Sequence, residues 1–145
     1  ACAHRLDDPD PEPFPPHCLV GTPGQGRVWA TARAETTVIG PDEHLSGELP
    51  RHLTLEKRRY DLFSHPDAAR LVALYGRNDP MFVVYGVATD YCVQAAVLGL
   101  LDRGYRVAVV ADAVRAVDPE REPEVLTGFV HRGALLTLTD VICDA

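Results

Sequence analysis

The sequence lacks an excess of positive charge and any long apolar run. Its 145 residues include 14 basic and 21 acidic side chains, for a formal net charge of -7. This balance argues against nucleic acid and anionic membranes as partners, because both select basic surfaces. No window approaches 18 consecutive apolar residues, and no basic segment with an apolar core opens the sequence, so we expect a cytoplasmic chain without a transmembrane helix. The expected partner is a small molecule.

Paired cysteine motifs are also lacking. The four cysteines (Cys2, Cys18, Cys92 and Cys143) form no CxxC pair, which is typical of reduced thiols, although the spacing leaves a Cys2–Cys18 bridge open. The sequence starts without methionine, and no strand is recognisable before its first loop. We therefore expect a chain that is truncated at the N-terminus.

The sequence has the pattern of strands and helices expected of one α/β domain over residues 1–145, and its hydrophobic content is 46%. Residues 5–26 form a proline-rich loop. Short strands are predicted at 36–39 and 52–57, and helical spacing of apolar residues predicts a helix within 66–75.

The second half predicts a βαβ unit. MFVVYG (81–86) and RVAVVAD (106–112) are near-continuous apolar runs of strand length, which is typical of parallel strands buried on both faces. The helix between them has Thr89 or Asp90 as its expected N-cap and Gly104 as its stop. A helix across 119–132 and a strand within 134–143 complete the predicted layers.

Cys92 follows the strand 81–86 and lies in the first turn of the next helix. Chemistry in parallel sheets gathers at the carboxyl ends of strands, and the positive end of the helix dipole stabilises a thiolate there. This position favours a nucleophile, whereas the more common use of a free cysteine is as a small buried apolar residue.

Lys57 is the only lysine in the chain. A compact ammonium at the end of a predicted strand can stabilise a thiolate or an oxyanion, while the alternative is a solvated charge beside Arg58 and Arg59. His17 follows two rigid prolines and could bind a metal with His4, although isolated loop histidines are usually surface residues.

Three segments carry a family resemblance: FPPHCLVGTPG (14–24), EKRRYDLF (56–63) and YGVATDYCVQAAVLGLLDRGYRVAVVADAVRAV (85–117). Together they resemble the isochorismatase-like cysteine hydrolases and, within these, the nicotinamidase-related amidases. The resemblance implies a three-layer α/β/α, Rossmann-like fold with a mainly parallel sheet. It also implies a Cys-Lys-Asp triad and a divalent metal ion, usually zinc, manganese or iron.

The resemblance assigns roles to individual residues. Cys92 would be the nucleophile and Lys57 the triad lysine, with the backbone N–H groups of Ala88 and Cys92 as the oxyanion hole and a cis peptide between Val87 and Ala88. His4 and His17 match the metal-binding histidines, and Cys2 stands where the family has an aspartate. The substrate pocket would be lined by three aromatic residues: Phe14, Tyr60 and Tyr91.

The implied activity is hydrolysis of nicotinamide to nicotinate and ammonia through a cysteine thioester. One departure is serious, because the triad aspartate lies on a strand that this sequence does not contain. Two alternatives therefore stay open: an amidase for another carbamoyl or ureido compound, and a non-catalytic α/β binding module. Relatives of this kind commonly form dimers or tetramers, so a homo-oligomer is a further expectation by analogy.

Overall fold

The computed structural model describes residues 1–8 and 15–144. The chain divides into two compact units, Ala1–Leu74 and Tyr75–Ala145. Each unit holds a parallel sheet and at least one helix, so the mixed α/β class predicted from the sequence is confirmed. None of the helices in the described ranges has the length and apolar character needed to cross a membrane.

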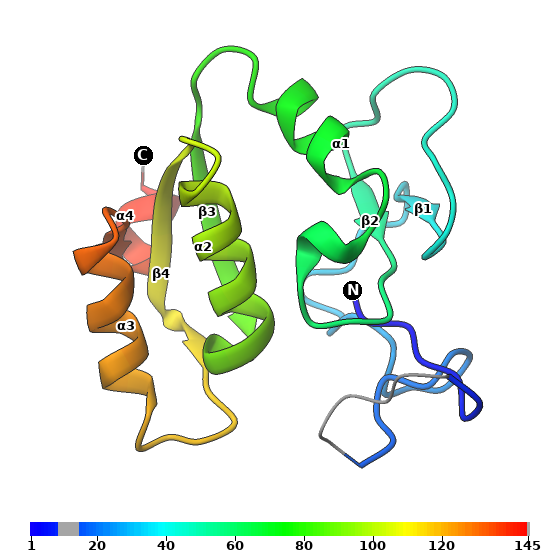
Figure 1. The fold of residues 1–145 in the computed structure, drawn as a ribbon, viewed down its shortest axis with the longest axis horizontal. Helices are drawn as coiled ribbons and strands as arrows, with labels where there is room; N and C mark the ends of the chain where they lie inside the picture. Colours follow the sequence, from blue (N-terminus) through cyan, green and yellow to red (C-terminus); the bar gives the residue numbers. More distant parts are fainter. Residues whose placement is uncertain (9–14, 145) are drawn as a thin grey trace. The chain divides into compact units, whose positions relative to one another are not determined.

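The first unit is built on two short parallel strands, β1 (Thr37–Ile39) and β2 (Leu53–Leu55) (Figure 1). They are followed by a 3-10 turn, η1 (Leu62–Ser64), and by helix α1 (Ala68–Tyr75). The strands β1 and β2 and the helix α1 fall within the segments predicted from the sequence, whereas η1 was not predicted.

The first residues of the chain also pair in this unit, although we predicted no strand before the first loop. Cys2 forms a parallel bridge with Lys57, and His4 forms one with Leu19. The Ala3 amide donates to the Lys57 carbonyl, and the Lys57 amide donates to the Ala1 carbonyl, both at 2.9 Å. These are isolated bridges and not a strand, so no strand precedes the first loop in the described residues, as predicted, although backbone hydrogen bonds tie the first residues to two other segments.

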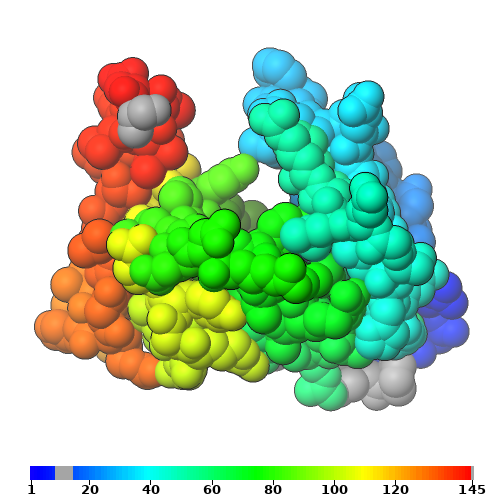
Figure 2. Space-filling view, turned by 90° about the horizontal axis from the view of Figure 1, so that it is seen from above, coloured from blue at the N-terminus to red at the C-terminus, as the bar shows by residue number. Residues whose placement is uncertain are grey.

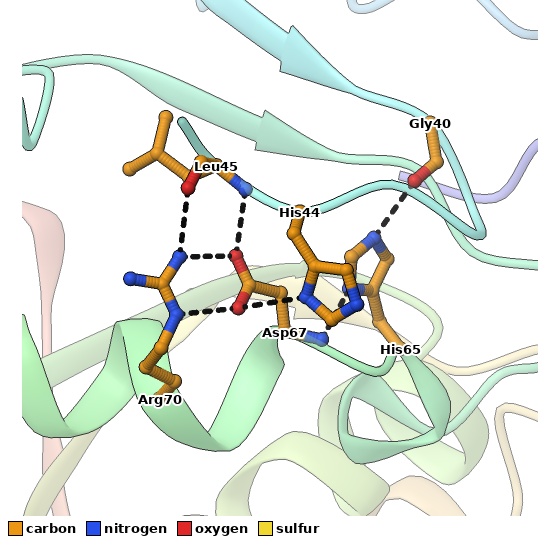
Figure 3. A network of polar contacts seen from close by, with 6 residues as sticks. All are labelled: Gly40, His44, Leu45, His65, Asp67 and Arg70. Atoms are coloured by element: carbon orange, nitrogen blue, oxygen red, sulfur yellow. Dashed lines mark hydrogen bonds and ion pairs between the residues drawn. The ribbon is translucent and has the colours of Figure 1, made fainter. Parts of the chain in front are cut away.

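A buried carboxylate organises the loop after β1 (Figure 3). Asp67, at the start of α1, pairs with Arg70 through both oxygens at 2.6 and 2.7 Å. The same carboxylate accepts the Leu45 amide at 2.9 Å and lies 3.3 Å from His44 Nδ1. His65 donates from Nε2 to the Gly40 carbonyl and accepts the Asp67 amide at Nδ1. These contacts fix the loop to the start of the helix, and no local sequence pattern predicts them.

The second unit is a three-stranded parallel sheet in the order β3-β4-β5. Its helices lie on both faces of the sheet: α2 and α3 lie on one face and α4 on the other, as Figures 1 and 2 show from two directions. The elements are β3 (Met81–Val87), α2 (Gln94–Leu101), β4 (Arg106–Arg115), α3 (Glu122–His131), β5 (Leu135–Thr137) and α4 (Thr139–Cys143).

Burial differs between the two strands that we predicted to be covered on both faces. The central strand β4 is buried at four successive positions, 107–110, as predicted. In β3, by contrast, Val83, Tyr85 and Val87 are exposed. The prediction was wrong for β3 because these alternate side chains lie on one face of the strand, and that face is not covered.

Helix α2 ends as the sequence predicts. Gly104 adopts a positive φ of 80°, which glycine adopts without steric cost, and its amide donates to the Leu101 carbonyl at 2.9 Å. The chain can then turn directly into β4.

Candidate active site

Cys92 lies in a tight turn between β3 and α2. This turn, η2 (Thr89–Val93), is a π-type turn that runs directly into α2. The amides of Tyr91 and Val93 both donate to the Ala88 carbonyl, at 3.1 and 3.0 Å. The Cys92 residue is partly exposed.

The peptide bond between Val87 and Ala88 is cis. The family resemblance implied this bond, and the structure confirms it. We had predicted that Thr89 or Asp90 would cap the helix, and this prediction was wrong. The residue before the turn is Ala88, without a side-chain cap, because the side chains of Thr89 and Asp90 bond to a different segment.

That segment follows β4. Asp90, which is buried, accepts the Val117 amide at 3.0 Å with one oxygen and the Asp118 amide at 3.1 Å with the other. Burial raises the pKa of Asp90, but the hydrogen bonds from these backbone amides outweigh it, and the pKa lies below its ordinary value. The Cys92 turn is therefore held by an ionised carboxylate.

A second carboxylate holds the same turn from helix α3. Glu122 accepts the hydroxyl of Thr89 at 2.9 Å and the amide of Ala116 at 2.5 Å with the same oxygen. Its other oxygen pairs with Arg115 at 3.2 Å. Sequence reasoning missed this contact because the two residues are 33 positions apart and no local pattern joins them.

Lys57 lies in the first unit, two residues after β2, and is only 7% exposed. Its ammonium donates to the carbonyls of Arg59 and Tyr60 at 2.7 and 2.9 Å, and it lies 3.1 Å from the sulfur of Cys2. The alternative of a solvated strand-end charge is therefore wrong for this side chain. Burial requires such partners, because an unpaired buried ammonium would be costly.

His4 and His17 lie together in the same unit, with ring centroids 4.6 Å apart and planes inclined by 53°. His17 Nδ1 donates to the Pro15 carbonyl at 3.0 Å, so Nε2 is the nitrogen that carries the lone pair. His4 Nδ1 lies 3.6 Å from the Asp8 carboxylate. A carbonyl or carboxylate on one ring nitrogen is the usual support for a histidine that binds a metal through the other.

The donor set is nevertheless small. Over residues 1–8 and 15–144, no group of three or more His, Cys, Asp or Glu side chains is arranged to hold a metal ion. The Cys2 thiol, at the position where the family has an aspartate, contacts Lys57. The two histidines could thus supply two ligands to one metal ion, and the described residues place no third ligand beside them.

The aromatic residues predicted for the substrate pocket divide between the units. Tyr60 is exposed in the first unit, and Tyr91 is partly exposed beside Cys92 in the second. Phe14 lies outside the described residues. No disulfide joins the cysteines within the described part of the chain, and the bridge left open between Cys2 and Cys18 is not formed.

Comparison with known proteins shows the family to which this chain belongs. A family model described as the Isochorismatase domain matches residues 4–141. The chain is 41% identical over 61 residues to the nicotinamidase of Escherichia coli (strain K12), which covers 40% of this chain and 29% of that enzyme. The chain spans less than half the length of the curated relatives that it matches.

Solved structures show the same fold. The pyrazinamidase of Pyrococcus horikoshii in complex with zinc is 28% identical, with a TM-score of 0.63 over 87% of this chain and 63% of that chain. The N-carbamoylsarcosine amidase from Thermoplasma acidophilum is 23% identical, with a TM-score of 0.69 over 96% of this chain and 69% of that chain. At that identity the second likeness concerns the fold alone.

Proposed function

This chain belongs to the isochorismatase family, and from that premise we propose that it forms the nucleophile-bearing part of a cysteine amidohydrolase. Its proposed substrate is nicotinamide, which water converts to nicotinate and ammonia. The observation that carries the proposal is the position of Cys92, partly exposed in a braced turn at the carboxyl end of β3. The similarity to a nicotinamidase supports the choice of substrate.

The reaction begins when the Cys92 sulfur attacks the amide carbon, and the proton of the thiol passes to a general base. In this family an aspartate takes that proton, and no residue of this chain is assigned to the role. The backbone N–H groups of Ala88 and Cys92 stabilise the oxyanion. One such donor contributes roughly a hundredfold or more to the rate, so the geometry of the turn matters as much as the thiol.

Collapse of the tetrahedral species breaks the C–N bond. The leaving amine takes up a proton and departs as ammonia, which leaves an acyl thioester on Cys92. Water then attacks the thioester carbon, nicotinate is released and the thiol is restored. Lys57 matches the triad lysine of the family and is proposed to stabilise the negative charge that develops in these steps, since an ammonium interacts favourably with an anion.

His4 and His17 are the residues that would hold a divalent metal ion, with zinc as the first candidate. The support is their close pairing, the His17 tautomer fixed by Pro15, and the zinc complex of the Pyrococcus horikoshii relative. When bound, such an ion supplies Lewis-acid chemistry. Tyr60, Tyr91 and Phe14 are proposed to contact a flat aromatic substrate, to which their rings are suited.

The test is ammonia release from nicotinamide by the full-length protein with zinc or manganese added. Replacing the nucleophile with Cys92→Ala should lower the rate by at least about a thousandfold. Cys143→Ala, at an exposed cysteine of α4, is the matched control and should keep the parent rate.

Two results would count against the proposal. Parent activity in Cys92→Ala would remove Cys92 as the nucleophile. No turnover of nicotinamide by the folded, metal-loaded protein, with turnover of a carbamoyl compound instead, would replace the proposed substrate while keeping the reaction type.

A further inference from the structure

Cys2 and Lys57 bring a thiol and an amine into contact inside the first unit. Cys2 Sγ lies 3.1 Å from Lys57 Nζ. The two residues also face each other across a parallel bridge, with backbone hydrogen bonds of 2.9 Å on either side. The contact is therefore set by strand pairing as well as by the side chains.

The amine is held in place by further contacts. Lys57 Nζ donates to the carbonyls of Arg59 and Tyr60, at 2.7 and 2.9 Å, and the side chain is buried. A buried lysine held in one position has little conformational freedom left to lose when it reacts, which raises its effective concentration toward the adjacent sulfur.

A small oxidant can approach this region. Lys57, though not Cys2, lines a pocket of about 240 Å³ within the first unit, which has room for a peroxide molecule beside the amine, since one water takes up about 30 Å³ in the liquid. Cys2 is itself only partly buried. The proposed amidase reaction assigns no role to the Cys2 thiol, so its contact with Lys57 needs an explanation of its own.

We propose that Cys2 and Lys57 form an oxidative cross-linking site, in which hydrogen peroxide converts the Cys2 thiol to a sulfenic acid and Lys57 closes a sulfenamide. In the first step peroxide transfers one oxygen atom to sulfur and leaves as water. In the second step Nζ attacks Sγ, the S–N bond forms and the S–O bond breaks. Nζ attacks as the neutral amine, after its ammonium has given one proton to solvent, and the departing hydroxide takes a second proton from nitrogen to become water.

The cross-link removes the positive charge of Lys57 and joins the start of the chain covalently to this lysine, two residues after β2. Thiols reverse the reaction by attacking sulfur and returning the amine. If Lys57 acts as proposed in amide hydrolysis, the cross-link switches that activity off reversibly. Only this consequence rests on the proposed function, and the cross-link itself does not.

The test is mass spectrometry of the full chain after treatment with hydrogen peroxide, with a chelator present to suppress metal-catalysed oxidation. Because Lys57 is the only lysine in the chain, any cross-link to a lysine side chain must involve Lys57. We expect a peptide pair joined through Cys2 and Lys57, two hydrogens lighter than its parts, with trypsin cleavage after Lys57 lost. Dithiothreitol should restore both peptides.

Three variants and one denatured sample serve as controls. Cys2→Ser should abolish the cross-link, and Lys57→Arg should leave Cys2 as a sulfenic acid that dimedone traps. Cys143→Ser, at the exposed cysteine, should leave the cross-link unchanged. Treatment in urea should abolish the cross-link in the parent chain, because the contact depends on the fold.

Three outcomes would overturn the proposal. These are a Cys2 sulfenic acid beside a Lys57 that trypsin still cleaves, a Cys2–Cys18 disulfide in place of the cross-link, and an equal yield in urea. Each is read from masses, so a protein inactive toward nicotinamide would leave the test intact.

Discussion

Asp90, two residues before Cys92, accepts the backbone amide of Val117 at 3.0 Å, and this bond joins the turn after β3 to the segment after β4. The second oxygen of the same carboxylate accepts the next amide, that of Asp118, at 3.1 Å. The proposed nucleophile therefore depends on a buried anion for its position, although Asp90 itself has no place in the proposed chemistry.

Replacing the Asp90 carboxylate should destabilise the folded chain, because the turn after β3 loses its bonds to the segment after β4. In Asp90→Ala the amides of Val117 and Asp118 lose their hydrogen bonds to a carboxylate, so we expect a loss of about 2 to 3 kcal/mol in the free energy of unfolding, measured by urea denaturation. Asp144→Ala, at an exposed carboxylate after α4, is the control and should change little. Equal stability of the two variants would show that the amides find other partners.

Thr89 allows a second test of the contacts that hold the turn η2. Its hydroxyl donates to Glu122 at 2.9 Å, and the residue is fully buried. Thr89→Val keeps the shape but removes the donor to a carboxylate, so we expect a loss of about 1.5 to 3 kcal/mol in the free energy of unfolding.

The matched control for Thr89→Val is Thr127→Val, which removes an exposed hydroxyl bond to the Pro123 carbonyl within α3. Thermal or urea unfolding measures both variants. If Thr127→Val costs as much as Thr89→Val, the contact with Glu122 has no special weight.

Asp67 should give the first unit an acid-sensitive stability. Its hydrogen bonds to Arg70 are the largest cause that holds the pKa of this carboxyl well below its usual range. A lowered pKa in the folded state contributes stability that is complete above the unfolded value, about 3.9, and that is lost as pH falls further toward the folded value. Asp67→Asn should cost about 2 to 4 kcal/mol at pH 7.

The measurement for Asp67 is urea unfolding of parent and Asp67→Asn between pH 7 and pH 2.5. The difference in free energy of unfolding should stay constant down to about pH 5 and shrink below pH 4. Asp42→Asn is the control, since Asp42 also pairs with an arginine through both oxygens but is exposed. It should show a much smaller difference at every pH. A constant difference for Asp67→Asn down to pH 2.5 would contradict the assignment.

The elements of the fold were predictable where the sequence carries a long local pattern. The strands β3 and β4 and the helix between them followed from apolar runs, helical spacing and Gly104. Pairing of the first residues was not predictable, because it rests on backbone hydrogen bonds to distant segments: Ala1 and Ala3 bond to Lys57, and His4 bonds to Cys18 and Val20. The exposure of β3 was also missed, because an apolar run does not reveal whether both faces of its strand are covered.

For the candidate site, residue types and local position were enough to select Cys92, Lys57 and the two histidines. The partners of those residues were not predictable. Glu122, which holds the turn of Cys92 through Thr89, carried no signal in the sequence, since an acidic residue shows its role only through the donors that folding brings to it. The residue facing Lys57 was missed for the same reason, because Cys2 lies 55 positions away.

The histidine pair gives a prediction that does not depend on turnover. His17 presents the lone pair of Nε2 because its Nδ1 donates to the Pro15 carbonyl, and its ring lies 4.6 Å from that of His4. Loss of one of the two imidazole ligands in His17→Gln should weaken zinc binding by at least about a hundredfold, measured by competition with a chromophoric chelator.

The control is His131→Gln, which removes an exposed imidazole in the last turn of α3 and should leave the zinc affinity unchanged. His4→Gln should match His17→Gln if both rings bind the same ion. Parent affinity in either of the two variants would show that zinc binds elsewhere, and it would separate the metal from the Cys92 chemistry because no substrate is needed to measure it.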